Sequence, residues 1–403
     1  MRKIVLGFLV IAFTFITNNT FSQASYDQTL GQELNAITTA VPFLMIAPDS
    51  RSGAMGDAGV ALSPDGYSQH WNSSKLAFIN QSMGATMSYT PWLKQLVDDI
   101  NLAYLTGYWK LDEYQTFGAG LRYFSMGSIT FTDEENNSLG DYSPHEFSID
   151  GSYNRKLSDH FALGFVGRFI YSNLTGGQGA GDETTQAGKS VALDINGFYT
   201  HKMEISGYKG NWAAGFNISN VGVKLGYTEI EKNFIPTNLR LGGAATIDID
   251  SYNSITATLD INKLLVPTPP VYYLNSEGTS DSLNTNGDKV IEAGMDNDVS
   301  VIQGMVQSFY DAPAGFVEEM HEISYAAGVE YWYAKQFAVR GGYFYEHATK
   351  GNRKYFTTGV GLKMNVFGLD FSYLIPAGNF NNSPLSNTWR FSLIFDMDAL
   401  SNQ

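Results

Sequence analysis

The chain has 403 residues, with 25 lysines and arginines against 40 aspartates and glutamates, which gives a formal net charge of -15. This acidic balance argues against nucleic acid as a partner, because nucleic acid binding depends on clustered positive charge. The absence of cysteine excludes a disulfide framework, a thiol nucleophile and a lipid anchor on an N-terminal cysteine, and 14% aromatic residues, 41 glycines and only 16% charged residues are unusual for a soluble globular protein.

Residues 1–22 have the features of a secretory signal peptide. Arg2 and Lys3 precede an apolar run, and small residues follow it, so cleavage is expected near Ser22 or Gln23. The apolar run is shorter than the roughly 20 residues that a membrane-spanning helix needs, and no later run reaches that length. A membrane location would therefore require a β-barrel.

Residues 23–82 precede the first predicted strand and show neither a helical nor a strand period. Within this segment, 42–59 mixes apolar and small residues with a few charges and with recurring glycines, which allow close approach of the backbone to a wall. We predict that 23–82 is a periplasmic N-terminal segment and a compact hatch, or plug, packed inside a larger structure. The candidate hatch residues are Asp49, Arg51, Gly53, Gly56, Asp57 and Gly59.

From 83 to 396, apolar and small or polar residues alternate in segments of strand length. In 161–171, for example, the odd positions are mostly large and apolar, while the even positions are mostly small and include Arg168. A soluble β-sandwich also alternates, so the lengths and connections must decide. The predicted strands lie near 83–90, 100–109, 115–124, 145–155, 160–172, 190–200, 211–219, 239–249, 254–262, 322–333, 337–346, 354–362, 367–375 and 388–396.

The connections between these segments alternate between short turns and long polar loops, the longest being 263–321. Strands of this length, with short turns on one side and long loops on the other, are typical of bacterial outer-membrane barrels with periplasmic termini. We therefore predict an all-β protein, a transmembrane antiparallel β-barrel of about 14 strands at 83–396, followed by a C-terminal tail at 397–403. Closure is required because an open sheet edge would leave unpaired backbone groups in hydrocarbon.

A barrel of this size is wider than side chains from its own wall can fill. Charged residues occupy positions that are expected to face the lumen, and the hatch charges Asp49, Arg51 and Asp57 can pair with some of them, such as Glu330, Arg340 and Arg390. The simplest interpretation is that these ions only hold the hatch in place by satisfying one another. The predicted lumen-facing charges are Arg122, Arg168, Glu330, Arg340, Glu346 and Arg390.

Several stretches resemble a known family: 42–61, Gln69-His70-Trp71-Asn72 with Leu76 and Ala77, 330–333, 337–345, 350–356, 366–370 and 387–391. They are similar to the PorV family, also called LptO, of the type IX secretion system. That family lies within a wider group of FadL-like barrels that have an N-terminal hatch. The resemblance covers nearly the whole mature chain, is densest at the hatch and the last five strands, and is least informative in the loop 263–321.

The resemblance implies a non-enzymatic outer-membrane protein. PorV-like proteins bind exported cargo that carries a C-terminal secretion domain as it leaves the translocon pore protein. They shuttle the cargo to a surface attachment complex that contains a sortase, where the signal is removed and the cargo is joined to lipopolysaccharide. The family's cargo contacts do not single out residues of this chain.

Enzyme motifs are weak in this sequence. Gly53, Gly56 and Gly59 do not have dinucleotide-binding spacing, and the P-loop-like end at Gly188-Lys189-Ser190 lacks its first glycine. The six histidines are scattered, and no nucleophile elbow occurs. We expect no catalytic residue and no cofactor, although paired carboxylates in a hydrolase site stay possible.

One stretch of the long loop, 284–296, places oxygen ligands at alternate positions around a glycine, as calcium loops do. Its spacing misses the EF-hand pattern by one residue, and a solvated acidic loop is the preferred interpretation. The weak calcium candidates are Asn284, Asn286, Asp288 and Glu292; otherwise no metal site is expected.

Two hypotheses of different classes remain. The first is an interaction protein that uses the long loops of a plugged barrel to dock exported proteins and the translocon. The alternative is a FadL-like transporter that passes fatty acids or other hydrophobic small molecules past a mobile hatch, which requires an apolar pocket between hatch and wall.

Overall fold

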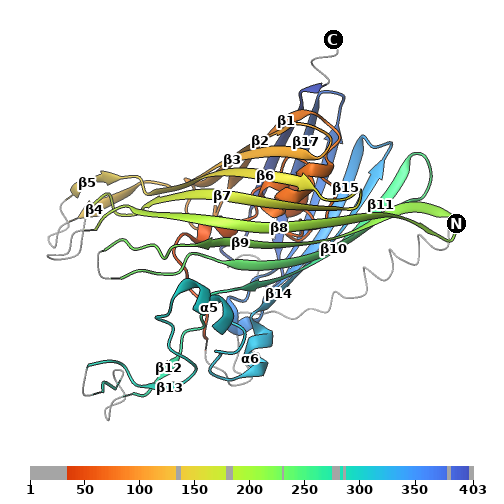
Figure 1. The fold of residues 1–403 in the computed structure, drawn as a ribbon. Helices are drawn as coiled ribbons and strands as arrows, with labels where there is room; N and C mark the ends of the chain where they lie inside the picture. Colours follow the sequence, from red (N-terminus) through yellow and green to blue (C-terminus); the bar gives the residue numbers. More distant parts are fainter. Residues whose placement is uncertain are drawn as a thin grey trace.

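The computed structural model describes residues 34–132, 138–177, 185–228, 231–274, 282–284, 287–378 and 383–398. Fourteen antiparallel strands of this part of the chain form a closed barrel, in which β1 pairs with both β2 and β18 (Figure 1). The predicted all-β, antiparallel barrel of about 14 strands is confirmed. Its strands are β1 (Met83–Pro91), β2 (Ile100–Lys110), β3 (Gln115–Met126), β6 (His145–Lys156), β7 (Phe161–Asn173), β8 (Gly188–Ile205), β9 (Tyr208–Gly222), β10 (Asn238–Asp248), β11 (Asn253–Leu264), β14 (Ile323–Tyr333), β15 (Phe337–Tyr345), β16 (Lys354–Lys363), β17 (Phe367–Pro376) and β18 (Trp389–Asp396).

The alternation in the sequence becomes the two faces of the wall. In β7, Phe165 and Phe169 point outward and are 46% and 39% exposed, whereas Val166 and Ile170 point inward and are fully buried. Successive side chains of a strand point to opposite faces, so one period-2 pattern produces both an apolar outer surface and a packed interior. No helix in the described ranges is long and apolar enough to cross a membrane.

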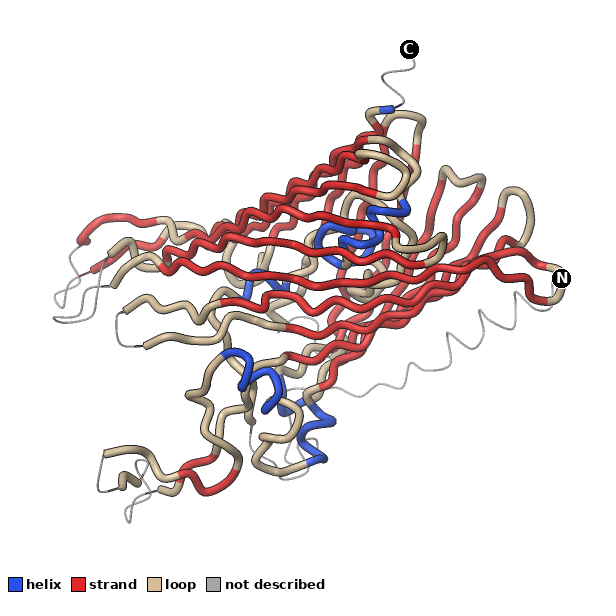
Figure 2. The backbone as a smooth tube through the Cα atoms, viewed as in Figure 1, coloured by secondary structure: helices blue, strands red, loops and turns tan. Residues whose placement is uncertain are grey.

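Short turns gather at one end of the barrel and long loops at the other, and β18, the last strand, ends at the short-turn end (Figures 1 and 2). The turn between β8 and β9 is tighter than the sequence suggested, because both strands extend to Ile205 and Tyr208. The long loops carry small elements of their own. These are β4 (Ile129–Thr132), β5 (Ser138–Tyr142), β12 (Val271–Tyr272), β13 (Ile291–Ala293), α5 (Val301–Gln307), α6 (Phe316–His321) and η3 (Ala348–Lys350).

The residues that precede β1, here called the inner segment (residues 34–82), run through the barrel interior. Their short helices are η1 (Pro42–Met45), α3 (Ser50–Gly53), α4 (Ser68–Trp71) and η2 (Ser73–Phe78), and most side chains of the inner segment are buried (red to orange in Figure 1). Asp49 begins α3 by accepting a hydrogen bond from the Ser52 backbone N–H at 2.8 Å, as an N-cap does.

The inner segment crosses the barrel from end to end. At the long-loop end, the Asn35 N–H donates to the Thr349 carbonyl at 3.1 Å and the Ala40 N–H donates to the Phe234 carbonyl at 2.9 Å. At the short-turn end, Lys110 Nζ donates to the Ile79 carbonyl at 3.0 Å. The described part of this segment therefore begins at the long-loop end, whereas residues 23–33, where the periplasmic start was predicted, lie outside the described residues. A coil without a period carries no sign of its direction in the sequence.

Candidate functional site

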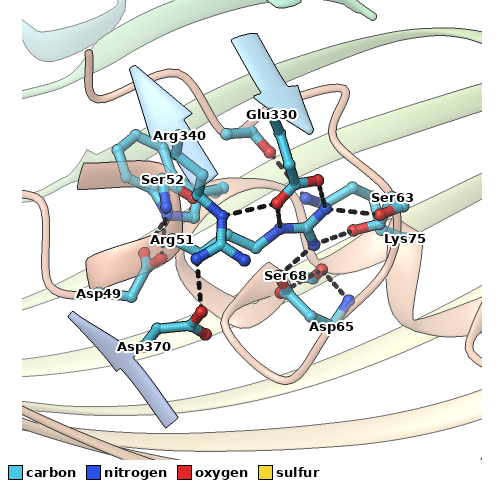
Figure 3. A network of polar contacts seen from close by, with 12 residues as sticks. Asp49, Arg51, Ser52, Ser63, Asp65, Ser68, Lys75, Glu330, Arg340 and Asp370 are labelled. Atoms are coloured by element: carbon cyan, nitrogen blue, oxygen red, sulfur yellow. Dashed lines mark hydrogen bonds and ion pairs between the residues drawn. The ribbon is translucent and has the colours of Figure 1, made fainter. Parts of the chain in front are cut away.

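The charged centre of the interior joins the inner segment to wall residues on β14, β15 and β17. Arg51 of α3 donates to both carboxylate oxygens of Glu330, at 2.9 and 3.0 Å, and to Asp65 at 2.9 Å (Figure 3). On the other side, Arg340 donates to Glu330 at 2.7 Å and pairs with Asp370. A forked guanidinium suits such two-point recognition of a carboxylate. Glu330 thus holds two buried arginines, one from the wall and one from the inner segment.

Asp49 does not join this network through a wall charge. Its carboxylate accepts from the Trp71 indole N–H at 2.6 Å and from the Ser52 N–H. It therefore ties α3 to α4 within the inner segment. The sequence did not distinguish this role from a wall contact, because a buried carboxylate is satisfied equally well by neutral donors.

Asp57 lies against another part of the wall, on β16 and β18. The Tyr355 hydroxyl donates to one of its oxygens, and Arg390 forms an ion pair with the other at 3.4 Å. Within the described part of the chain, the three guanidinium nitrogens of Arg390 have no hydrogen-bond acceptor, although the side chain is buried. Gly53 lies beside it, and a Cβ there would come within 2.7 Å of Arg390 Nη1.

Two of the candidate hatch glycines are in contact with the wall through their backbone. Gly56 has φ +73°, which disfavours L side chains, and a Cβ there would meet the Tyr343 carbonyl oxygen at 2.5 Å. The Gly59 N–H donates to Asp260 Oδ2 at 2.7 Å, and its carbonyl accepts from Lys75 Nζ at 2.7 Å.

The remaining predicted charges, Arg122, Arg168 and Glu346, each have a different kind of partner. Arg122 donates to the Leu44 carbonyl at 2.9 Å and contacts His70 Nδ1 at 2.6 Å, so it also holds the inner segment. Arg168 instead pairs within the wall, with Asp150 at 2.7 Å and Asp194 at 3.0 Å. Glu346 lies beyond the end of β15, in the loop to β16, and pairs with the half-exposed Arg353 at 2.7 Å.

Sequence reasoning missed the polar wall residues that bind the inner segment without forming an ion pair. Asp260 accepts from the N–H groups of Gly59 and Val60 at 2.7 and 2.9 Å, and Asn196 accepts from the Ser74 N–H at 2.9 Å. Both occupy inward positions of predicted strands. Their position on the polar face was the available signal, but it did not show which backbone groups they would meet.

The calcium candidates lie in an exposed part of the long loop. Asn284 donates to Asp288 Oδ2 at 3.1 Å, and its own side-chain oxygen accepts from the Asp288 N–H at 2.9 Å, as in a turn. Asn286 lies outside the described residues, and Glu292 is in β13. In the described ranges, no three histidine, aspartate or glutamate residues gather as a metal cluster. Calcium binding here stays a prediction for titration.

A second charged cluster fastens the long loop (residues 265–322) to the barrel rim. Lys263 pairs with Glu319 and Glu322 at 3.1 and 2.7 Å, and Lys350 pairs with Glu318 and Glu322 at 2.6 and 3.0 Å. Asn35 donates to Glu318 Oε1 at 3.2 Å, so the inner segment reaches this cluster too. The loop is therefore anchored at its α6 end rather than hanging freely from the rim.

Beside this cluster, the imidazole rings of His321 and His347 stack face to face, 3.5 Å apart. Burial, the neighbouring His321 and two lysines lower the pKa of His347 to about 4, and burial and Lys350 lower the pKa of His321. Because the folded state disfavours protonation, this stack contributes stability above the ordinary pKa of about 6.5 and loses it as pH falls toward 4.

We expect the long loop to be cut faster by protease on intact cells at pH about 5 than at pH about 7.5. His347→Gln should reduce this difference, whereas His201→Gln, at the exposed short-turn end, should leave it unchanged. Burial raises the pKa of Asp311 to about 6, which acts in the opposite direction, so the comparison of variants isolates the histidines. Equal cleavage of the native loop at both pH values would contradict the expectation.

A closed barrel with an apolar outer wall, long loops at one end and its own N-terminal chain in the lumen defines a multi-pass outer-membrane β-barrel protein. Residues 29–271 match the family described as type IX secretion system protein PorV. The chain belongs to this family, as its sequence resemblance predicted. The long-loop end then corresponds to the cell surface and the short-turn end to the periplasm.

Solved structures with a similar fold include the toluene transporter TbuX of Ralstonia pickettii, with 11% identity, 86% of this chain and 96% of that chain covered, and a TM-score of 0.42. The toluene transporter TodX of Pseudomonas putida has 12% identity, with 90% and 98% covered and a TM-score of 0.43. A FadL homologue of Pseudomonas aeruginosa has 11% identity, with 90% and 99% covered and a TM-score of 0.41. The search of curated proteins finds no match.

The direction of the inner segment predicts that its start is accessible from outside the cell. Leu34 is 71% exposed, and the native chain has no cysteine. In intact cells, Leu34→Cys should therefore react with a membrane-impermeant maleimide. Lys335→Cys, in the short turn between β14 and β15, should react only after the outer membrane is permeabilised. Protection of the Leu34→Cys thiol in intact cells would overturn this orientation.

Proposed function

We propose that this protein is a non-enzymatic component of the type IX secretion system that binds exported proteins through their C-terminal secretion signal. It shuttles them from the translocon pore protein to the surface attachment complex with its sortase, where lipopolysaccharide is joined to the cargo. Membership of the PorV family supports the role in this secretion system. That the protein carries cargo is our further inference.

The observation that carries the proposal is the way the inner segment is held. Its Arg51 and Asp57 meet Glu330 and Arg390 on different parts of the wall, and its backbone contacts glycines of the wall directly. An inner segment that is bound to several parts of the wall suits a protein whose partners bind to its outer loops. A transport path through the lumen would require these buried pairs to separate at each passage.

The long loops supply a surface for such partners. Large apolar side chains of the long loop face solvent, including Tyr310 at 61% and Phe316 at 78% exposed. Exposed apolar groups of this kind, next to the anchored charges of α6, are typical of protein interaction surfaces.

The first test distinguishes an inner segment that stays fixed in the lumen from one that must move for function. The hydroxyl oxygens of Ser50 and Ser392 lie 3.1 Å apart, so the double variant Ser50→Cys, Ser392→Cys should form a disulfide between the inner segment and β18. We expect the oxidised variant to retain normal surface display and signal cleavage of cargo, as do both single-cysteine controls. Loss of display that reductant restores would contradict the proposal.

A gene deletion supplies the second test, because it should leave cargo uncleaved or trapped. The purified native protein should carry bound cargo, and its lumen should hold no fatty acid. Normal surface display in the deletion strain would exclude the secretion role.

The alternative, transport of hydrophobic small molecules, has one observation in its favour. A cavity of about 350 Å³ lies between residues 38–42 of the inner segment and wall residues such as Phe124, Met126 and Glu146. If this cavity is a transport site, the oxidised disulfide variant should lose fatty-acid uptake, and the deletion strain should lose it too. Unchanged uptake in both strains removes this function.

A further inference from the structure

An apolar groove of about 720 Å³ lies on the outside of the barrel, where the loop that precedes α5 crosses β8 and β9 near the long-loop end. Val191 and Leu193 of β8 form one side, and Ile302 of α5 lies on the other. This groove belongs neither to the lumen nor to the charged cluster that anchors α6. It therefore has no part in holding the inner segment.

The groove is continuous with the lipid-facing surface of the barrel. Val191 and Leu193 are 57% and 45% exposed, on the same outward face as Phe169 of β7, which is paired with Val191. Two pairs closer to the cell surface, Tyr171 is paired with Lys189. Aromatic and basic residues at this position mark the membrane interface, so the groove begins where acyl chains of the outer leaflet begin.

A local irregularity of the wall creates the groove. The register between β8 and β9 shifts between Leu193 and Ile195, and Asp194 turns inward to accept from the Asn220 N–H at 2.7 Å. Asn220 adopts φ 59°, and β9 ends two residues later. The pairing of β9 with β10 ends at Ser219, so residues 220–222 of β9 have no strand on that side, and residues 299–302 of the long loop form the outer side of the space.

Two amines lie at the edge of this apolar space. Lys224 lines the groove, and its Nζ lies 3.0 Å from Asp298, whose side chain is 94% exposed. Lys189 lies on the outward face of β8, two residues from Val191, and is exposed. The apolar groove, with two amines on its cell-surface side, suits a molecule that has an acyl chain and an anionic headgroup.

We propose that this groove binds an acyl chain of an anionic outer-leaflet lipid, with the headgroup phosphate at Lys189 and Lys224. The bound lipid holds α5 against the membrane surface beside the barrel. This inference depends on the outer-membrane location and is independent of the proposed handling of cargo. It gives the long loop two attachments, a charged one at α6 and a lipid one at α5.

The test uses the full-length protein in vesicles that contain phospholipids brominated on their acyl chains. Bromine quenches nearby tryptophan, so Ile302→Trp should be quenched after subtraction of the native signal. Val317→Trp, on the exposed face of α6, is the matched control and should be quenched less. Equal quenching at the two positions would overturn the proposal.

The headgroup is tested by comparing brominated phosphatidylglycerol with brominated phosphatidylcholine. We expect Ile302→Trp to prefer the anionic lipid by about fivefold per amine, and Lys189→Gln with Lys224→Gln to remove the preference. Equal quenching by both lipids would overturn the anionic part. If the tryptophan of Ile302→Trp is unquenched in vesicles yet shielded in outer-membrane extracts, the occupant is a protein and the lipid proposal is wrong.

Discussion

Gly342→Ala is expected to destabilise the barrel by at least about 3 kcal/mol, the upper end of the usual cost of overpacking. A Cβ on Gly342 would lie 2.1 Å from the Gly56 nitrogen and 2.2 Å from the Met55 carbonyl carbon. Both neighbours are backbone atoms, so no change of side-chain rotamer can relieve the contact. Gly56 itself has φ +73° and has little freedom to move away.

The adjacent Gly341 supplies a matched control. Its nearest atom for an added Cβ is the Thr357 carbonyl oxygen at 3.9 Å, so Gly341→Ala should be nearly neutral. Urea unfolding of the purified proteins, followed by the gel mobility of the folded barrel, measures both. If Gly342→Ala prevents assembly, the amount of folded protein in the outer membrane gives the same comparison. Equal behaviour of the two variants would show that the inner segment does not press against this strand.

The second large effect is expected for Glu330→Gln. This change leaves Arg51 and Arg340 buried without the carboxylate that both bind, and removal of one partner from a buried ion pair costs about 3–5 kcal/mol. Because Arg51 belongs to the inner segment, loss of its ion pair with Glu330 should also weaken the attachment of the inner segment to the wall. Planar bilayer recordings should then show channel openings that the native protein lacks.

Glu346→Gln is the control for this charge change. Its partner Arg353 has a side chain 49% exposed, and exposed pairs contribute about 0–1 kcal/mol. We therefore expect native unfolding and no added conductance from it. The double variant Arg51→Met, Glu330→Leu removes both charges and should recover part of the stability lost in Glu330→Gln. Similar results for Glu330→Gln and Glu346→Gln would contradict a structural role for the network.

The wall of the barrel was predictable because its determinants are local. Alternation of apolar and small residues, as in β7, reports both faces of a strand from the sequence alone. The contrast between short turns and long loops, together with strand length, predicted the closed antiparallel barrel and the number of its strands. The strand ends were less predictable, as in β8 and β9, which extend beyond the segments that show clear alternation.

The contacts of the inner segment were not predictable at the same level. The sequence grouped Asp49, Arg51 and Asp57 as hatch charges that pair with charges of the wall. In the structure Arg51 contacts Glu330 and Asp57 contacts Arg390, but Asp49 contacts Trp71 of the inner segment. Glu346 had the same parity as Arg340, but the strand ends before it, and it pairs in a loop. Each of these outcomes depends on residues distant in sequence, which a periodic pattern does not report.

By itself, the sequence determined a membrane barrel, its strand number and its family, since strand period, strand length and family motifs can be read from the sequence of each segment. Only the tertiary structure decided the direction of the inner segment and the partner of each buried charge. It also decided where an apolar groove forms on the outer surface of the barrel. The physical reason is that any inward carboxylate can satisfy any nearby donor, and the backbone contacts at Gly56 and Gly342 select one arrangement among many.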